Sequence, residues 1–222
     1  MTRANPAVTC GQMAETSVAA LDPRLQKQME SARVAYGRGN FDVTLHLCRA
    51  VLKERPACLS ARRLHRTAAL RLHQGSGAPF VVSFGAPPDS PPDLIPGVDP
   101  ESQPLAAVGN AEKMIESDPH DTGALRLLGQ AAAALGWKET AVFAYESIRD
   151  EAPRDAGNLV ALGQAQLDAG RAQEAMATAG SALRLEPRHA AAQDLLRQAT
   201  AAQNFRTGRW DEIAGLGGRV GA

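Results

Sequence analysis

One fixed spacing recurs along this chain and constrains its fold more than any other feature. Prolines that end apolar, helix-like stretches recur at Pro119, Pro153 and Pro187, whose residue numbers differ by 34 at each step. The same step separates two pairs of glycines, Gly129 from Gly163 and Gly136 from Gly170. A fixed period of this length indicates one supersecondary unit that is repeated in a stack, because each unit buries its apolar face only against its neighbours.

Two segments, 122–153 and 156–187, match each other place by place. Each has a Leu-Gly pair at its seventh and eighth places, Leu128-Gly129 and Leu162-Gly163, a glycine that ends a first helix and a proline that ends a second. They resemble tetratricopeptide repeats, and the segment 25–56 is similar to the same repeat. The resemblance implies an all-α fold, a right-handed α-solenoid of helix-turn-helix repeats, and a role in protein–protein interaction.

The repeat register predicts the domain organisation. We expect a flexible N-terminal segment over 1–22, one tetratricopeptide repeat domain over 23–214 and a flexible tail over 215–222. Within that domain we expect repeats over 25–58, 59–121, 122–155 and 156–189, followed by a capping helix over 190–206. A capping helix of this kind shields the open end of a stack from solvent.

The second expected repeat is longer than the others. The interval from Pro56 to Pro119 is almost twice the interval from Pro119 to Pro153. A proline-rich stretch over 74–104 accounts for the excess, because neither a regular helix nor a central strand tolerates so many prolines. We therefore expect a surface insertion between the two helices of this repeat. His65 and Arg66 stand where the repeat pattern has a large apolar and a small residue.

Composition and motifs narrow the classes of function. The three cysteines form no CxxC pair, and no apolar run is long enough for a membrane span or a signal peptide, so we expect a cytoplasmic protein. None of the five histidines has a metal-ligand partner at the usual spacing, and no nucleotide-binding or nucleophile motif occurs. The sequence thus predicts a non-catalytic protein without a cofactor or a metal site.

The resemblance also implies a binding surface. In tetratricopeptide repeats, the second, fifth, ninth and twelfth places of each first helix line a concave groove. The polar and large residues at these places are the predicted partner-binding set: Arg33, Tyr36, Arg63, Arg126, Gln130, Gln164, Leu167 and Gln198. Three glutamines in it are spaced by the repeat period, and an amide both donates to and accepts from a peptide backbone. The arginines favour an acidic partner. We expect an adaptor or assembly scaffold that binds a peptide or protein segment in this groove.

An uneven distribution of charge leaves two further hypotheses. Residues 1–80 hold twelve Lys or Arg against five Asp or Glu, whereas residues 81–222 hold twelve against nineteen. Copies of the chain could therefore associate head to tail. The helix expected over 59–73 also carries a cluster of Arg and His residues, which favours the alternative that it binds nucleic acid or another polyanion. The low aromatic content, 4%, weighs against nucleic acid.

Overall fold

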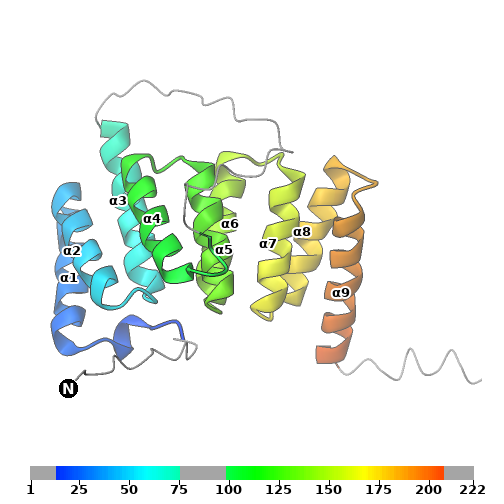
Figure 1. Cartoon of the computed structure of the whole chain (residues 1–222), viewed down its shortest axis with the longest axis horizontal. Helices are drawn as coiled ribbons and strands as arrows, with labels where there is room; N and C mark the ends of the chain where they lie inside the picture. The colour runs from blue at the N-terminus through cyan, green and yellow to red at the C-terminus, as the bar shows by residue number, and fades with distance from the viewer. Residues whose placement is uncertain (1–13, 76–98, 208–222) are drawn as a thin grey trace, which may run out of the picture.

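The computed structural model describes residues 14–75 and 99–207, and all regular structure in these two ranges is helical. The helices stack side by side along the long axis of the molecule, from α1 to α9 (Figure 1). In chain order they are the 3-10 helix η1 (Val18–Ala20), α1 (Pro23–Gly37), α2 (Phe41–Glu54), α3 (Leu59–Gly75), α4 (Pro104–Ser117), α5 (Thr122–Ala134), α6 (Lys138–Glu151), α7 (Ala156–Asp168), α8 (Ala172–Leu185) and α9 (Ala190–Thr207). The fold is a tetratricopeptide-like helical solenoid, as the sequence predicts.

Three helix pairs are closed by the same turn. Gly39, Gly136 and Gly170 have φ angles of 76°, 74° and 78°, which favour glycine, and no other described residue has a positive φ. The amide of each glycine donates to the carbonyl three residues back, and the next amide donates to the carbonyl five residues back. This is the Schellman motif, which ends a helix and reverses the chain. The pairs α1–α2, α5–α6 and α7–α8 are therefore equivalent hairpins.

Alanine and leucine at helical spacing build the core between these hairpins. The largest hydrophobic cluster extends over α4 to α7 and includes Leu125, Leu128 and Ile148, all fully buried. Trp137, in the α5–α6 turn, is also fully buried in this cluster. Asp121 and Asp155, again one period apart, cap α5 and α7 by accepting hydrogen bonds from backbone N–H groups of the first turn. Such caps satisfy donors that would otherwise lack a partner.

The helices α3 and α4 differ from the expected hairpin because they run in the same direction (Figure 1). Arg62 on α3 contacts Glu112 on α4, and His65, three residues further along α3, contacts Glu116, four residues further along α4. In an antiparallel pair the second contact would lie earlier on α4. The segments 59–73 and 105–119 therefore do not form one helix-turn-helix repeat, and the expected repeat over 59–121 is wrong in this respect.

The parallel direction of α3 and α4 explains why the chain between them is longer than between the other helices. A short turn joins antiparallel helices, but a parallel pair needs a connection that returns along the whole helix. The 14 residues of α4 extend about 21 Å at a rise of about 1.5 Å per residue. The expected insertion over 74–104 includes the end of α3 and the first residue of α4, and its central part, 76–98, lies outside the described residues. We call residues 14–75 the N-terminal unit and residues 99–207 the C-terminal unit.

The N-terminal segment is packed over a larger part than expected. Leu21 is buried in the core beside α1 and α2, and the Thr16 amide donates to the Ala57 carbonyl at 3.0 Å. The Glu15 carboxylate accepts hydrogen bonds from the Thr140 amide and hydroxyl, both at 2.6 Å. The prediction of a flexible segment over 1–22 is therefore wrong for residues 14–22. Residues 1–13, 208–214 and the predicted tail 215–222 lie outside the described ranges.

Candidate binding site between α5 and α7

The first helices of the C-terminal unit share one register. The helices α5, α7 and α9 start at Thr122, Ala156 and Ala190, so Gln130, Gln164 and Gln198 are each the ninth residue of their helix. The Gln130 side chain is half-buried, whereas Gln164 and Gln198 are exposed. The equivalence of the three glutamines predicted from the sequence is confirmed, although their surroundings differ.

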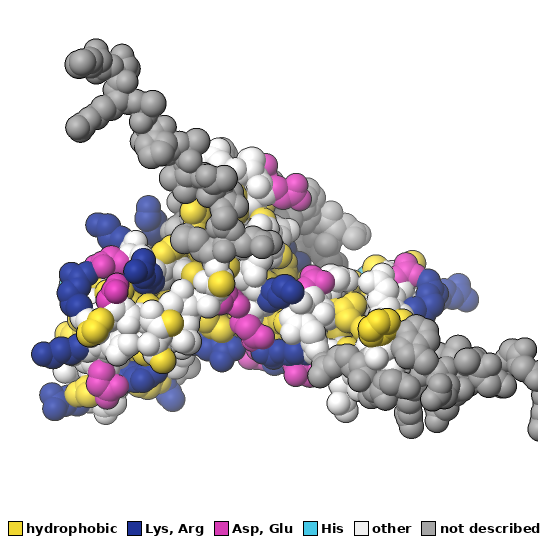
Figure 2. Space-filling model, turned by 90° about the horizontal axis from the view of Figure 1, so that it is seen from below, with side chains coloured by type: hydrophobic (Ala, Val, Ile, Leu, Met, Phe, Trp, Pro, Cys, Tyr) yellow, Lys and Arg dark blue, Asp and Glu magenta, His cyan; other side chains and the backbone are white. Residues whose placement is uncertain are grey.

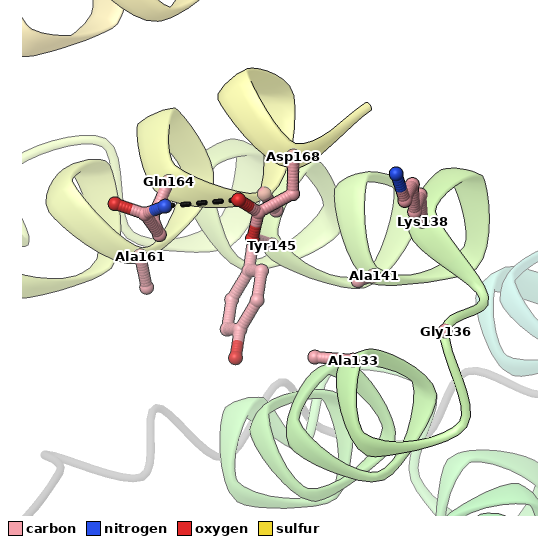
Figure 3. A pocket seen from close by; sticks show the side chains of 9 residues that line it. Ala133, Gly136, Lys138, Ala141, Tyr145, Ala161, Gln164 and Asp168 are labelled. Carbon is pink, nitrogen blue, oxygen red and sulfur yellow. Dashed lines mark hydrogen bonds between the residues drawn. The ribbon is translucent and has the colours of Figure 1, made fainter. Parts of the chain in front are cut away.

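A pocket of about 560 Å³ opens between α5 and α7, and α6 lines its third side (Figure 3). Its apolar lining comes mainly from alanines, namely Ala133 on α5, Ala141 on α6, and Ala161 and Ala165 on α7. Because these side chains are short, the helices leave space that larger residues would fill. Ligand pockets in proteins commonly have volumes of about 300–1,000 Å³ and an apolar lining with a few polar groups. The pocket therefore has the size and character of a binding site.

Tyr145 of α6 supplies a polar group in this pocket. Its ring packs against Gly129 of α5, and only 8% of the residue is exposed. The ring lies between the helices, with its hydroxyl directed away from α6 (Figure 3). Burial raises the pKa of the hydroxyl, and the nearby charge of Arg126 opposes that rise. Tyr145 is therefore neutral near pH 7, with a hydroxyl that can both donate and accept a hydrogen bond.

Charged and amide side chains surround the pocket opening. The Gln164 amide donates to the Asp168 carboxylate at 3.0 Å, which fixes the orientation of this glutamine (Figure 3). Lys138, the first residue of α6, is exposed and also lines the pocket. One cation and one anion thus face the same opening, and their charges balance. This favours an uncharged group in the pocket and polar main-chain groups at its edge.

Arg126 lies beside the pocket and is already paired. Its guanidinium contacts the Asp155 carboxylate at 3.0 Å, and both side chains are half-buried. The other oxygen of Asp155 accepts a hydrogen bond from the backbone N–H of Asn158 and so caps α7. A single aspartate therefore links the orientation of Arg126 to the start of α7. Paired in this way, Arg126 does not provide a free positive charge for an acidic partner.

The eight residues predicted to line one groove are not all brought together. Gln164 is the one that lines the pocket; Arg126, Gln130 and Leu167 lie on the same two helices outside its lining, and Gln198 lies on α9. Arg63 is placed elsewhere, over the ring of Phe143 on α6 at 5.7 Å. Phe143 and Tyr145 are two residues apart, hence about 200° apart around the helix. Arg63 therefore contacts α6 on the face opposite to the pocket.

Arg33 and Tyr36 belong to α1, in the N-terminal unit. Arg33 is exposed and lies 3.7 Å from Glu30 on the same helix, and the Tyr36 ring contacts the ring of Phe41 at 5.6 Å. On the face shown in Figure 2, Lys and Arg side chains gather at the end of the molecule formed by α1 and α2. Since α3 and α4 are parallel, the first helices of the two units run in opposite directions. They do not continue one groove.

Sequence reasoning missed Tyr145, Lys138 and Asp168. The first two belong to a second helix, while the resemblance directed attention to first helices. One signal was available, because the small Gly129 at a helix crossing leaves room for a large side chain opposite it, and Tyr145 is the large residue that contacts it. The four alanines around it indicated unfilled volume.

The basic helix of the alternative hypothesis is α3, and several of its cations are not accessible. Arg62, His65 and Arg66 are buried, and each contacts a glutamate of the C-terminal unit. Phosphate binding requires exposed cations. The arrangement of α3 therefore gives no support to the nucleic-acid alternative.

The described ranges lack two other kinds of feature. Between residues 14–75 and 99–207, no three His, Cys, Asp or Glu side chains are grouped as metal ligands. In these same ranges, no helix has the length and apolar character that crossing a bilayer requires.

Comparison with known proteins gives structural neighbours only. The sequence matches no protein-family model and no curated protein. Among solved structures, it is similar to TTC0263, a thermophilic TPR protein of Thermus thermophilus, with 20% identity, coverage of 80% of this chain and 87% of that one, and a TM-score of 0.38. A MamA mutant shows 15% identity, coverage of 85% and 91%, and a TM-score of 0.41. MamA MSR-1 shows 14% identity, coverage of 83% and 99%, and a TM-score of 0.35. The class of protein, a TPR-like helical-repeat protein, follows from the repeat period and the three equivalent hairpins of this chain.

Proposed function

We propose that this chain is a non-catalytic adaptor or assembly scaffold that binds an extended segment of a partner protein across α5 and α7. The observation that carries the proposal is the alanine-lined pocket with the Tyr145 hydroxyl inside it. A bulky uncharged side chain of the segment, such as Leu or Phe, would occupy the pocket. Gln164, which lines the pocket, and Gln130, about one turn of α5 before Ala133, would form hydrogen bonds with the main chain of the segment.

The charges around the pocket refine the expected partner. Because Lys138 and Asp168 balance each other and Arg126 is paired, the pocket favours an apolar anchor over the acidic partner predicted from the sequence. Head-to-tail association of copies and a cytoplasmic location stay predictions.

A pair of neighbouring alanines gives a sharp test. Ala133 and Ala134 are consecutive exposed residues at the end of α5, and only Ala133 lines the pocket. Peptides that bind the wild-type protein would be selected from a displayed random library, and their affinities measured by fluorescence polarisation. Ala133→Phe should fill the pocket and weaken binding at least about tenfold, since a lost apolar anchor is worth about 1.5–3 kcal/mol. Ala134→Phe should bind like the wild type.

Two results would contradict the proposal. One is a library that yields no peptide with a shared bulky apolar residue. The other is equal binding by Ala133→Phe and the wild type, with unchanged circular dichroism for both proteins. Either result would mean that the pocket is not where the partner binds.

A further inference from the structure

The two units have separate apolar cores. Among the described residues, two hydrophobic clusters lie wholly in the N-terminal unit, and a third lies wholly in the C-terminal unit. The remaining cluster belongs to the C-terminal unit and includes one residue from the other side, Ala57. Burial of apolar surface therefore contributes little to holding the units together. The contact between them must depend on other interactions.

Charged and polar groups make several contacts between the units. Arg62, 3% exposed, donates to the Glu112 carboxylate at 2.7 and 2.9 Å, and its guanidinium lies 5.5 Å from the centre of the Trp137 ring. Arg66 donates to Glu151 at 2.9 Å, and His65 lies 3.6 Å from Glu116. We call the Arg62–Glu112 and Arg66–Glu151 pairs, the pair between Arg49 and Glu116, and the Glu15–Thr140 contact the ionic joint.

Burying the charged groups of the ionic joint carries a free-energy cost. The Arg66 Nε atom is buried and has no hydrogen-bond partner, so the guanidinium is incompletely satisfied. Removing charges from water is unfavourable, and ion pairing offsets this cost only with good geometry. Interfaces between domains that are not large and apolar commonly permit relative motion. The joint thus has the composition of a separable interface.

The connection between the two units also differs from the connections between the other helices. Short turns join every other pair of consecutive helices from α1 to α9, but α3 and α4 are parallel and are connected through residues 76–98. The described residues therefore include no tight turn between the two units. Side-chain exposure is 3% for Arg62 and 21% for Glu112, and 11% for Arg66 and 23% for Glu151, so dissolved ions reach the glutamates, although they screen such pairs less than fully exposed ones.

We propose that the ionic joint opens as ionic strength rises, so that the N-terminal unit moves as a folded body relative to the C-terminal unit and its pocket. The N-terminal unit carries the basic excess of the chain, and opening changes where that charge lies relative to the pocket. The proposal is independent of what the pocket binds.

Cleavage of the folded, full-length protein within residues 76–98, at an inserted protease site, tests the proposal. The two fragments should co-elute in size-exclusion chromatography at about 0.05 M salt and separate at about 1 M, where the screening length falls to about 3 Å. Circular dichroism should show that the separated fragments keep their helices. Fragments that remain together at about 1 M salt, or that separate only with loss of helical signal, would overturn the proposal.

A matched set of variants assigns the effect to the joint. Glu112→Gln combined with Glu151→Gln removes two anions of the joint and should raise the dissociation constant of the cleaved fragments at least about tenfold. Glu54→Gln removes one anion of an exposed pair with Arg24, inside the N-terminal unit, and should leave it unchanged. Equal dissociation constants for the wild type and the double variant would show that these pairs do not hold the units together.

Discussion

The exchange Gly129→Ala tests the contact that shapes the pocket. A Cβ atom added at Gly129 would lie 2.8 Å from Tyr145 Cζ and 3.0 and 3.1 Å from the two neighbouring ring carbons. Carbon atoms in contact are normally about 3.5–4.0 Å apart, so the ring must move by about 0.7 Å or more. The Tyr145 hydroxyl moves with the ring, and this changes the pocket as well as the core.

Two opposing effects set the magnitude. Replacing glycine by alanine inside a helix stabilises it by about 1 kcal/mol, whereas forcing extra atoms into a packed core costs about 1–3 kcal/mol. Gly109→Ala, in α4, is the matched control, because no atom lies within 4 Å of the added Cβ. We expect Gly109→Ala to gain about 1 kcal/mol. Gly129→Ala should be about 1–3 kcal/mol less stable than that control.

Urea unfolding followed by circular dichroism measures the free energy of unfolding of both variants. Gly180→Ala, whose added Cβ would have Arg184 Nη1 as its nearest atom at 3.9 Å, should behave like Gly109→Ala. If Gly129→Ala is stabilised as much as these two variants, the Tyr145 ring does not pack on Gly129, and the description of the pocket is wrong.

Three further changes have defined outcomes. Asp155→Ala removes both the cap of α7 and the partner of Arg126, whereas Asp121→Ala removes only a cap, worth about 1 kcal/mol. Asp155→Ala should therefore lower the melting temperature more than Asp121→Ala does. Equal decreases in melting temperature would show that the Arg126 pair contributes nothing. Burial lowers the pKa of His65 below its ordinary 6.5, despite the opposing charges of Glu116 and Glu112. The unfolded chain therefore binds this proton more readily, and stability should fall as pH drops below about 6.5, less steeply in His65→Gln; parallel melting curves against pH would contradict this. Burial, with Cys58 nearby, raises the pKa of the Cys48 thiol to about 12, so mass spectrometry should find Cys48 unmodified by iodoacetamide at pH 8 until urea is added. Modification of the folded protein would show that Cys48 is accessible.

Much of the C-terminal unit could be predicted because its residues have local causes. Gly136 and Gly170 end helices through positive φ angles, and a period fixed by such turns places Gln130, Gln164 and Gln198 at equivalent positions. The pocket itself was less predictable. It arises from volumes that are absent, and which neighbour fills or leaves a space depends on packing between helices that are distant in sequence.

The direction of α4 could not be read from its own residues. Its apolar positions suit a helix packed in either direction, and the period suggested an interrupted hairpin. His65 and Arg66 were the local sign of a departure, since they occupy places that hold apolar and small residues in the repeat. Their partners, Glu116 and Glu151, lie beyond the connection between α3 and α4, and only the folded structure brings them together.

The parallel arrangement of α3 and α4 has an electrostatic consequence for ligand selection. In a uniform solenoid all first helices point the same way, and the partial positive charges of their amino ends add along one rim. Here α1 and α3 point opposite to α5 and α7, so each rim combines amino ends from one unit with carboxyl ends from the other. Their fields partly cancel. Within the C-terminal unit α5 and α7 point the same way, so only a ligand that extended to α1 or α3 as well would meet both kinds of helix end along one rim.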